Sequence, residues 1–359
     1  MPIYLKGSHY DIGYQHGQQL SETILMTVVP FIEEDMQESG ISMKEGLSIA
    51  NKYELLISKD YPEVMEETKG LADGAGIDFK KALLILLYWE VHDTVEQSIP
   101  ECSSFVAAGD ATVGGEPIAS QNSDWPKKMI GRGIPNVFHV SPDSGYSFIG
   151  RGLAGNLGRT SVIGFNEKGL GFVGSGINQL NEPGFGFPPL ILTRIGLERC
   201  STVEEFLGLV KSIPRWSHAG ENVDIVDKHG NMARISFGSR KTFVVQTKDH
   251  FLVSTNHFHN KELRYLGPET KESYPSSYER YDRLIDLLKA NYGKIDREVA
   301  TQIMSDHKHG NRPPDGGSSI CRHGSKQETM GNMIFLPNKR KFWMSRGTPC
   351  EGEYSEFKL

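Results

Sequence analysis

The spacing of apolar residues changes near residue 100, and this change limits the folds that the chain can adopt. Before about Val95 the apolar residues recur at helical spacing, as in the stretches 14–32 and 83–91. From Ser103 onward, short apolar segments are separated by glycine and interrupted by two helical interludes. Because strands and helices come in separate batches without regular βαβ alternation, the sequence predicts antiparallel sheets with helices packed outside them.

Individual elements follow from the same pattern. About three or four helices are predicted before residue 95, delimited or bent at Pro30 and Pro62, with a loop over residues 70–76. Later helices are predicted over residues 189–213, 278–291 and 296–305. Strands are predicted over residues 103–108, 117–120, 136–140, 161–165, 170–174, 223–226, 233–237, 242–246, 251–254, 319–322, 330–336 and 341–345. No linker rich in proline, glycine or serine divides the chain, which predicts a single domain over residues 1–359.

Charge and hydropathy exclude several classes of function. The 359 residues carry 39 lysines and arginines against 45 aspartates and glutamates, a net charge of −6. Without a basic block, this balance argues against a protein that binds nucleic acid through its phosphates. The longest apolar stretch, residues 82–89, is shorter than the ~20 residues that cross a bilayer, and the N-terminus lacks the pattern of a secretory signal. We therefore expect a cytoplasmic protein that binds a small molecule and does not contact membranes.

One of the four cysteines stands at the change of pattern. The cysteines lie far apart, which disfavours a disulfide framework or a thiolate zinc site, but Cys102 opens the first predicted strand. A turn near Val113 returns the chain through a second strand, and a hairpin centred there pairs Cys102 with Asp124. Centring the turn on residues 114–115 pairs Cys102 with Lys127 instead. In either register, Asn122 and Asp124 share one face of the second strand and lie near the thiol, as a catalytic site would need. The alternative is a surface strand whose polar side chains are solvated.

Several motifs together resemble a known family. The hairpin formed by Cys102–Ser104 and Gln121–Trp125 resembles the nucleophile hairpin of one group of N-terminal nucleophile hydrolases. This is the penicillin acyltransferase-like group, which is related to the choloylglycine hydrolases. Further similarities occur in order along nearly the whole chain, at Gly7, Gly13 and Gly17, at 163–170, at Ser254–His257 and at 346–349. Each motif alone is weak, and their order and spacing make the resemblance specific.

The resemblance implies a four-layer αββα sandwich of the α+β class and a self-catalysed cut between Glu101 and Cys102. A mostly helical segment, 1–101, and a sheet-rich segment, 102–359, would be the two products. Cys102 would then carry a free α-amine, whose pKa of about 7.7–8.0 lets it accept the thiol proton near neutral pH. The thiol would attack an amide carbonyl, and water or an amine would resolve the resulting thioester.

The resemblance also assigns roles to other residues. Asn256 matches the side chain that donates to the oxyanion, Asp124 the carboxylate that orients the α-amine, and Asn122 a neighbouring polar support. Arg322 is a candidate for a functional arginine of some relatives, with a structural salt bridge as the alternative. The chain departs from the pattern at Glu101, because many relatives have glycine immediately before the nucleophile.

The expected substrate is a small linear amide, such as an N-acyl amine or an N-acyl amino acid. His257 and Phe185 are candidates for substrate contact, the latter in an aromatic loop that could cover an acyl group. An acyl-coenzyme A or an amine acceptor is a conceivable second partner, and a homo-oligomer stays open, as does the choice between hydrolysis and transfer. We expect neither a cofactor nor a catalytic metal.

Two other classes of function remain as alternatives. A metal-dependent amidohydrolase would draw its ligands from His257, His259 and the 306–315 segment with His307, His309 and Asp315, although no His-Glu-x-x-His motif is present. A catalytically silent, uncleaved family member that only binds small molecules would explain Glu101.

Overall fold

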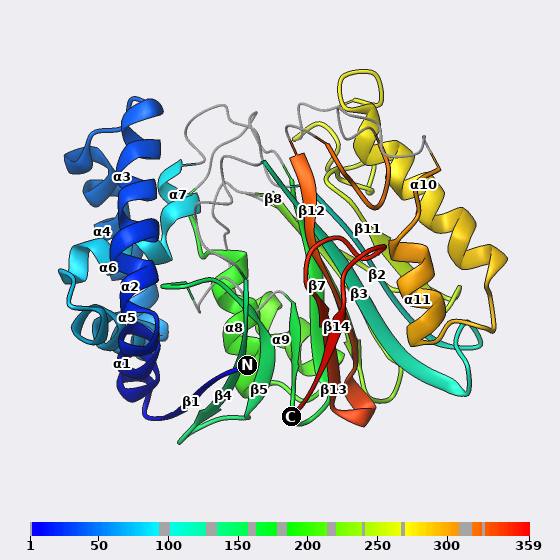
Figure 1. The fold of residues 1–359 in the computed structure, drawn as a ribbon, viewed down its shortest axis with the longest axis horizontal. Coiled ribbons are helices and arrows are strands. Elements are labelled where there is room, and N and C mark those ends of the chain that lie inside the picture. The colour runs from blue at the N-terminus through cyan, green and yellow to red at the C-terminus, as the bar shows by residue number, and fades with distance from the viewer. Residues whose placement is uncertain are drawn as a thin grey trace.

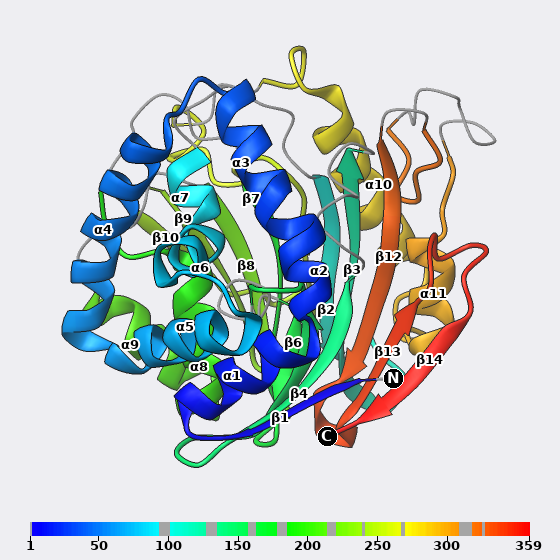
Figure 2. The ribbon, with the colours of Figure 1, turned by 60° about the vertical axis from the view of Figure 1, so that its left-hand side comes forward.

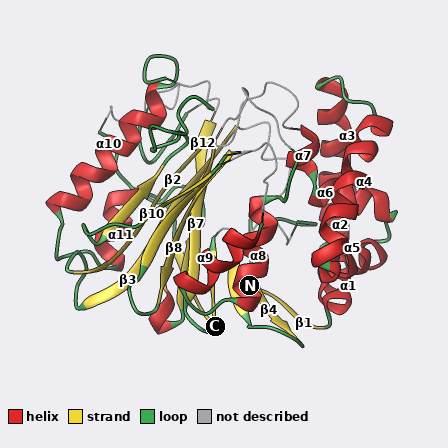
Figure 3. Cartoon of the chain, turned by 180° about the vertical axis from the view of Figure 1, so that it is seen from behind, coloured by secondary structure: helices red, strands yellow, loops and turns green. Residues whose placement is uncertain are grey.

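The computed structural model describes residues 2–92, 101–126, 135–156, 163–177, 185–213, 220–238, 241–266, 270–308, 318–324 and 327–359. Within these ranges two sheets lie face to face, and helices cover both outer faces (Figure 1). The same order of helix, sheet, sheet and helix is seen from behind in Figure 3. The predicted four-layer αββα sandwich is therefore confirmed.

The first sheet has eight strands among the described residues, in the order β1-β4-β5-β6-β7-β8-β9-β10. Its pairs are antiparallel except for β1 and β4, which run parallel at one edge (Figure 2). The strands are β1 (Ile3–Gly7), β4 (Asn136–Pro142), β5 (Phe148–Gly152), β6 (Gly164–Asn166), β7 (Leu170–Ile177), β8 (Gly220–Asp227), β9 (Met232–Phe237) and β10 (Thr242–Val245).

The second sheet has six described strands, all antiparallel, in the order β11-β2-β3-β12-β13-β14. Its strands are β2 (Glu101–Gly109), β3 (Gly115–Pro126), β11 (Phe251–Ser254), β12 (Gln327–Leu336), β13 (Lys341–Ser345) and β14 (Tyr354–Lys358). The hairpin of β2 and β3 occupies the centre of this sheet, so both of its faces are covered by other layers.

The outer layers are built from two sets of helices. The first sheet is covered by α1 (His9–Gln19), α2 (Ser21–Thr23), a π-helical turn (Ile24–Val28), α3 (Val29–Glu38), α4 (Met43–Asp60), α5 (Pro62–Ala75), α6 (Phe79–Leu86), α7 (Tyr88–His92), α8 (Pro189–Arg199) and α9 (Val203–Ser212). The second sheet is covered by α10 (Pro275–Ala290) and α11 (Arg297–Met304).

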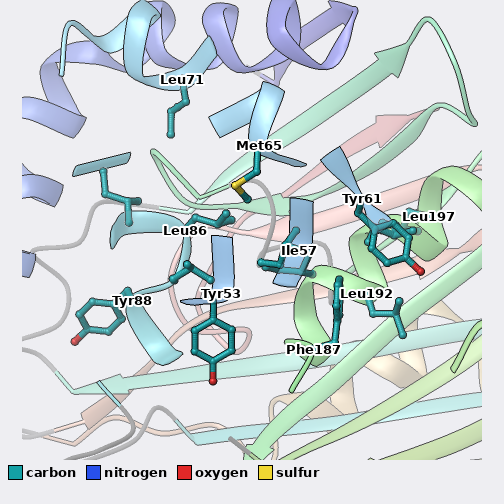
Figure 4. Packing of buried hydrophobic residues seen from close by; sticks show 14 of the residues in the cluster. Tyr53, Ile57, Tyr61, Met65, Leu71, Leu86, Tyr88, Phe187, Leu192 and Leu197 are labelled. Atoms are coloured by element: carbon teal, nitrogen blue, oxygen red, sulfur yellow. The ribbon is translucent and has the colours of Figure 1, made fainter. Parts of the chain in front are cut away.

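Three apolar cores separate the four layers, and the alternation of side chains along a strand distributes residues between them. On β2, Phe105 and Ala107 pack against α10 and α11, whereas Val106 and Ala108 pack between the two sheets. The largest core lies under the N-terminal helices, where Figure 4 shows Tyr61 beside Phe187, with ring centroids 5.1 Å apart. Every residue of β2 from Ser103 to Ala108 is buried, which explains its near-continuous run of small and apolar residues.

Helices α1 and α5 approach each other more closely than side chains would allow. A Cβ added to Gly13 would lie 1.9 Å from the carbonyl oxygen of Glu67, and one added to Gly70 would lie 2.0 Å from that of Tyr10. Gly17 and Gly74 repeat this contact one turn later, with 2.4 and 2.1 Å. The predicted loop over residues 70–76 is therefore wrong, because these glycines serve helix packing inside α5, and only Gly76, at φ 70°, ends the helix.

Other predicted elements agree with the structure except at a few places. Pro62 begins α5 and Pro30 lies in the first turn of α3, as expected. The strand predicted over residues 319–322 is wrong, since only His323 forms an isolated bridge there, with Glu328. Strands β1, β5 and β14 were not predicted. No helix in the described part of the chain is long and apolar enough to span a membrane.

Candidate active site

The β2–β3 hairpin determines where the predicted site residues lie. Cys102 is opposite Ser123, and Asp124 is opposite Glu101. The predicted pairing of Cys102 with Asp124 is therefore wrong by one residue. Gly109 pairs with Gly115, so the turn is centred on Thr112 and not on Val113, and a bulge between Ala107 and Gly109 then shifts the register of the rest of the hairpin by one residue. Since a shift of one residue moves a side chain to the other face of the sheet, the thiol and the Asp124 carboxylate belong to opposite faces.

The two faces of the hairpin have different environments. Glu101, Ser103, Asn122 and Asp124 share the face that packs against α10 and α11. Cys102 belongs to the other face, toward the first sheet, and is partly exposed. The Cys102 side chain therefore has no direct contact with the described polar side chains on the opposite face. The backbone of Glu101 and Cys102 is what connects them.

Strand β11 brings the late asparagine to Cys102. Ser254, the last residue of β11, is paired with Ser104, so the chain beyond it runs toward the start of β2. The backbone N–H of Cys102 donates to Asn256 Oδ1 at 2.9 Å, and Asn256 Nδ2 donates to the carbonyl oxygen of Gly176 on β7 at 2.9 Å. In this chain, with residues 101 and 102 joined, Asn256 presents its oxygen and not its amide nitrogen to Cys102.

A fully buried arginine on α10 holds the same backbone. Arg280 Nη1 donates to the carbonyl oxygen of Cys102 and, at 2.9 Å, to Ser103 Oγ. Its Nη2 donates to Asn256 Oδ1 at 2.9 Å and to Glu101 Oε2 at 2.5 Å. Because two donors converge on Asn256 Oδ1, the orientation of that amide is set by the network.

Glu101 is the second centre of charge, and Arg322 is its main partner. Arg322 binds the carboxylate in a bidentate manner, Nη1 to Oε1 at 2.9 Å and Nη2 to Oε2 at 2.8 Å, and Ser276 Oγ donates to Oε2 at 2.9 Å. Burial alone would raise the pKa of Glu101, but Arg322 and Arg280 outweigh it and the pKa is lowered. Glu101 is therefore an anion held on the face opposite the thiol.

Asp124 lies beside this ion network without sharing its strong contacts. Thr329 Oγ1 donates to Asp124 Oδ1 at 2.6 Å, and Arg322 Nε lies 3.7 Å from Oδ2. Burial is the main reason that the pKa of Asp124 is raised to about 6, against the lowering effect of Arg322 and Arg280. The carboxylate is thus less firmly ionised than Glu101 near neutral pH.

Asn122 ties the strand to the helical layer. Its Nδ2 donates to the carbonyl oxygens of Met304 and Ile320, at 2.8 and 2.9 Å, and its Oδ1 accepts from Asn332 Nδ2 at 2.9 Å. These bonds connect β3 to the end of α11 and to β12. The structure places Asn122 two residues from Asp124 on the same face, as predicted, with its amide engaged by backbone.

Comparison with known proteins identifies the family. The sequence profile described as acyl-coenzyme A:6-aminopenicillanic acid acyl-transferase matches residues 113–351, about two thirds of the chain. The chain belongs to this acyl-transferase family. The resemblance inferred from the motifs is thereby confirmed, and the matched range includes Asp124, Asn256, Arg280 and Arg322 but begins after Cys102.

More distant similarities cover most of the chain. An uncharacterized protein of Archaeoglobus fulgidus is 24% identical over 375 residues, which is 88% of this chain and only 58% of that relative. Penicillin V acylase from Agrobacterium tumefaciens is similar in structure with a TM-score of 0.48, at 15% identity, over 72% of this chain and 86% of the acylase. An N-acylethanolamine-hydrolyzing acid amidase ortholog of Caenorhabditis elegans has a TM-score of 0.46, at 15% identity, over 66% and 93% of the two chains.

On the thiol side of the hairpin, this member of the acyl-transferase family has a half-buried arginine. Arg151, on β5, donates from Nη1 to Ser123 Oγ at 2.9 Å, and Ser123 is the residue opposite Cys102. Its Nη2 has no hydrogen-bond partner among the described residues. Burial lowers the pKa of Arg151 to about 10, which still leaves it a cation near neutral pH.

The Cys102 thiol is protonated in the joined chain. Burial, with the negative charges of Asp124 and Glu221, raises the pKa of the thiol to about 12, while Arg151 and Arg280 act in the opposite direction. A thiol with this pKa needs a nearby base before it can attack a carbonyl.

A cleft of about 1150 Å³ opens between the edges of the two sheets, and Arg151 is part of its wall. Its apolar lining comes from both sheets and includes Val137, Ile149, Met333, Met344 and Phe357. Because Arg151 also contacts Ser123, this side chain connects the cleft with the surroundings of Cys102.

The two predicted substrate-contact residues lie in separate environments. Phe185 is exposed and packs against Tyr53 of α4, with ring centroids 4.9 Å apart. His257 is buried, stacks on Tyr278 at 3.8 Å and has its Nδ1 2.8 Å from Ser277 Oγ. Burial lowers the pKa of His257 to about 3, so it is neutral. Neither side chain has a described contact with Cys102.

Among the described residues, the histidines considered as an alternative metal set have separate neighbours. His257 and His259 stack on Tyr278 and Tyr281, in contact with each other, whereas His307 lies beside His323. His309 and Asp315 lie outside the described residues.

Sequence reasoning missed Arg280 and Arg151. A signal for Arg280 was present, because it shares the buried face of its helix with Leu284 and Leu288, at spacings of four and eight residues. A charge on an apolar helical face indicates a buried partner. Arg151 gave no comparable signal, because β5 was not recognised as a strand.

Proposed function

We propose that this chain is a self-processing cysteine amidase or acyltransferase, with Cys102 as nucleophile. One observation carries the proposal: the backbone nitrogen of Cys102, which becomes an α-amine if the preceding peptide is cut, donates to Asn256 Oδ1 at 2.9 Å. The carbonyl of the same residue is held by Arg280. Both ends of the Cys102 backbone are therefore fixed before any cut, as an N-terminal nucleophile requires.

The cut would proceed by attack of Cys102 Sγ on the carbonyl carbon of Glu101. The bond from that carbon to the Cys102 nitrogen breaks as a thioester forms, and the nitrogen takes up a proton. Water then opens the thioester, leaving a carboxylate on Glu101 and the free thiol on Cys102. The segment 1–101 would stay attached, because β1 pairs with β4 and its helices share the largest apolar core.

In turnover, the α-amine would take the thiol proton and Cys102 would attack the substrate amide. The Asn256 oxygen orients the amine, and Asp124, whose charge acts on Cys102, supports its protonated form. Arg151 Nη2, which has no hydrogen-bond partner in the described part of the chain, is the donor that we assign to the substrate or its oxyanion on the thiol side.

The substrate that we propose is a small linear N-acyl compound, with its apolar part in the cleft that Arg151 lines. The name of the family pairs an acyl-coenzyme A with an amine-bearing acceptor. We therefore propose an acyl-coenzyme A or a free amine as the second substrate when the thioester is transferred instead of hydrolysed.

Mass analysis of the purified chain tests the proposal. Under denaturing conditions we expect two products, 1–101 and 102–359, and under native conditions a single particle that contains both. The Cys200→Ala variant, which changes a buried cysteine outside the site, is the control and should be processed equally. An uncut wild-type chain with full amidase activity would refute the α-amine as the base.

Two substitutions of Asn256 separate its possible roles. If its oxygen orients the amine, Asn256→Asp should keep a substantial fraction of turnover, whereas Asn256→Ala should lose most of it. If its amide nitrogen instead donates to the oxyanion during turnover, both variants should lose about a hundredfold or more. Steady-state kcat and kcat/KM on an N-acyl substrate distinguish these results.

A further inference from the structure

Four metal-ligating side chains outside the proposed catalytic centre converge on one point. They are His307, Cys321, His323 and Cys350, and their ligand atoms all lie within 4.8 Å of one another. They come from three segments: the turn after α11, the stretch before β12, and the connection between β13 and β14. Figure 2 shows α11, β12, β13 and β14 as neighbours at this side of the molecule. Cys321 is buried and the other three are half-buried.

Four of the six distances between the ligand atoms are close to the edges of a tetrahedral site, and the two from His307 to the cysteines lie within 4.8 Å. Cys321 Sγ lies 3.7 Å from Cys350 Sγ, and His323 Nε2 lies 3.1 Å from His307 Nε2. The sulfur–nitrogen distances are 3.5 Å for Cys321 and 3.1 Å for Cys350, both to His323 Nε2. With Zn–S near 2.3 Å and Zn–N near 2.0–2.1 Å, a tetrahedral site has edges of about 3.8 Å for sulfur pairs, about 3.6 Å for mixed pairs and about 3.3 Å for nitrogen pairs.

We propose that His307, Cys321, His323 and Cys350 form a structural binding site for a tetrahedral divalent cation, with zinc as the expected ion. Two thiolates and two imidazoles are a ligand set that favours zinc over magnesium, calcium or manganese, which prefer oxygen. Four protein ligands leave no open position for water or substrate, so the site is structural and not catalytic.

The surroundings of the four ligands support a held site. The backbone N–H of Cys321 donates to the carbonyl oxygen of Asp306, the residue before His307, at 3.1 Å. The Asp306 carboxylate is itself bound by Arg283 of α10, at 2.9 and 2.6 Å. His323 forms a bridge with Glu328 at the start of β12. Hydrogen bonds next to the ligands thus hold the ligand-bearing segments together, as the residues around a metal site commonly do.

The site has a consequence for the ion network at Glu101. Arg322 lies between the two ligands Cys321 and His323, and its side chain binds the Glu101 carboxylate. A bound cation would hold the backbone on both sides of Arg322 and so keep its guanidinium on Glu101. An effect of the metal on the cut between Glu101 and Cys102 rests on the proposed function. Binding of the metal does not rest on it.

The principal competing state is a disulfide between Cys321 and Cys350. Their sulfurs are 3.7 Å apart, longer than the ~2.05 Å of a disulfide, and a disulfide would give no reason for two imidazole nitrogens to face the same point.

Metal analysis of the full-length chain, purified without added metal or chelator, tests the proposal. We expect about one zinc ion per chain, and a similar content after removal of the metal and incubation with Zn²⁺. Reconstitution with Co²⁺ should give the visible absorption of tetrahedral cobalt and a thiolate-to-cobalt charge-transfer band. Cys350→Ser and His307→Gln should each weaken binding by at least tenfold, whereas the controls Cys200→Ala and His229→Gln should bind as the wild type does.

Two results would overturn the proposal. One is a wild-type chain that binds neither Zn²⁺ nor Co²⁺ in stoichiometric amount, including one whose mass shows a Cys321–Cys350 disulfide. The other is unchanged binding in the double variant Cys350→Ser/His307→Gln. If the variants do not fold, removal of metal from the wild-type chain decides the question, because a structural site predicts a lower melting temperature that Zn²⁺ restores and Mg²⁺ does not. These readouts do not depend on catalysis, so they distinguish failure of the metal site from failure of the proposed function.

Discussion

Replacing Cys102 with alanine is expected to leave the 359-residue chain uncut and to abolish turnover. The change removes the sulfur atom that attacks the Glu101 carbonyl in the proposed cut, and this atom is also the nucleophile of the proposed acyl-transfer reaction. Fold stability should change little, because Cys102 is partly exposed and the hydrogen bonds of its backbone to Asn256 and Arg280 remain. Denaturing mass spectrometry and amide-hydrolysis rates measure the two effects.

The serine variant tests whether a weaker nucleophile at residue 102 still supports processing. Cys102→Ser keeps an attacking atom but with a poorer nucleophile and a higher pKa, so processing should be slow or absent. In the wild type the thiol has a pKa of about 12. At any pH well below this value, an increase of one pH unit therefore raises the thiolate fraction about tenfold. Uncut wild-type chain should therefore be processed faster at pH 8 than at pH 7, until another step limits the rate. Processing and turnover by Cys102→Ala would identify a different nucleophile.

Replacing Arg280 with methionine is expected to destabilise the fold by about 3–5 kcal/mol and to stop processing. The substitution leaves the Cys102 carbonyl and Asn256 Oδ1 without a charged donor, and leaves Glu101 to Arg322 and Ser276 in a buried site. Removing one partner of a buried ionic network costs more than the network contributes as a whole, because the remaining charge stays desolvated. Urea unfolding, followed by denaturing mass analysis of the folded fraction, measures both losses.

Two further variants separate charge from packing at Arg280. The exposed Lys289 lies on the same helix, and Lys289→Met should change stability by less than about 0.5 kcal/mol. The double variant Glu101→Gln/Arg280→Met should regain part of the lost stability, since it removes the buried carboxylate along with one of its cations. Equal stability of Arg280→Met and the wild type would show that the network contributes no net stabilisation.

The network also explains how this chain accommodates Glu101. The sequence indicated a conflict, because a bulky acidic residue stands where many relatives have glycine. In the structure the carboxylate lies on the face opposite the thiol and is bound by Arg322, Arg280 and Ser276. Glu101 is part of an ion network, and the two arginines of this network come from segments far away in the sequence.

Local patterns were sufficient for most of the fold. The helical periodicity before residue 95, the glycine-separated strands and the batches of helices predicted antiparallel sheets with helices outside them, because burial on one face of an element leaves a repeating trace in sequence. The four-layer arrangement itself was implied by the family resemblance. The failures were also physical. Gly70 and Gly74 were read as loop residues, although they allow α1 and α5 to touch. Strand β14, on an edge of the second sheet, is mostly half-buried or exposed and lacked a strong apolar pattern.

The sequence by itself determined the family, the hairpin that carries Cys102, and the place of Asp124 and Asn256 among the candidate site residues. Only the tertiary structure decided the register, which a bulge near the turn shifted by one residue, and with it the face on which each side chain lies. It alone also brought Arg280 and Arg322 to Glu101, and gathered His307, Cys321, His323 and Cys350 into one cluster. Periodicity records whether a residue is buried, whereas the convergence of distant side chains depends on how whole elements pack, which no local spacing encodes.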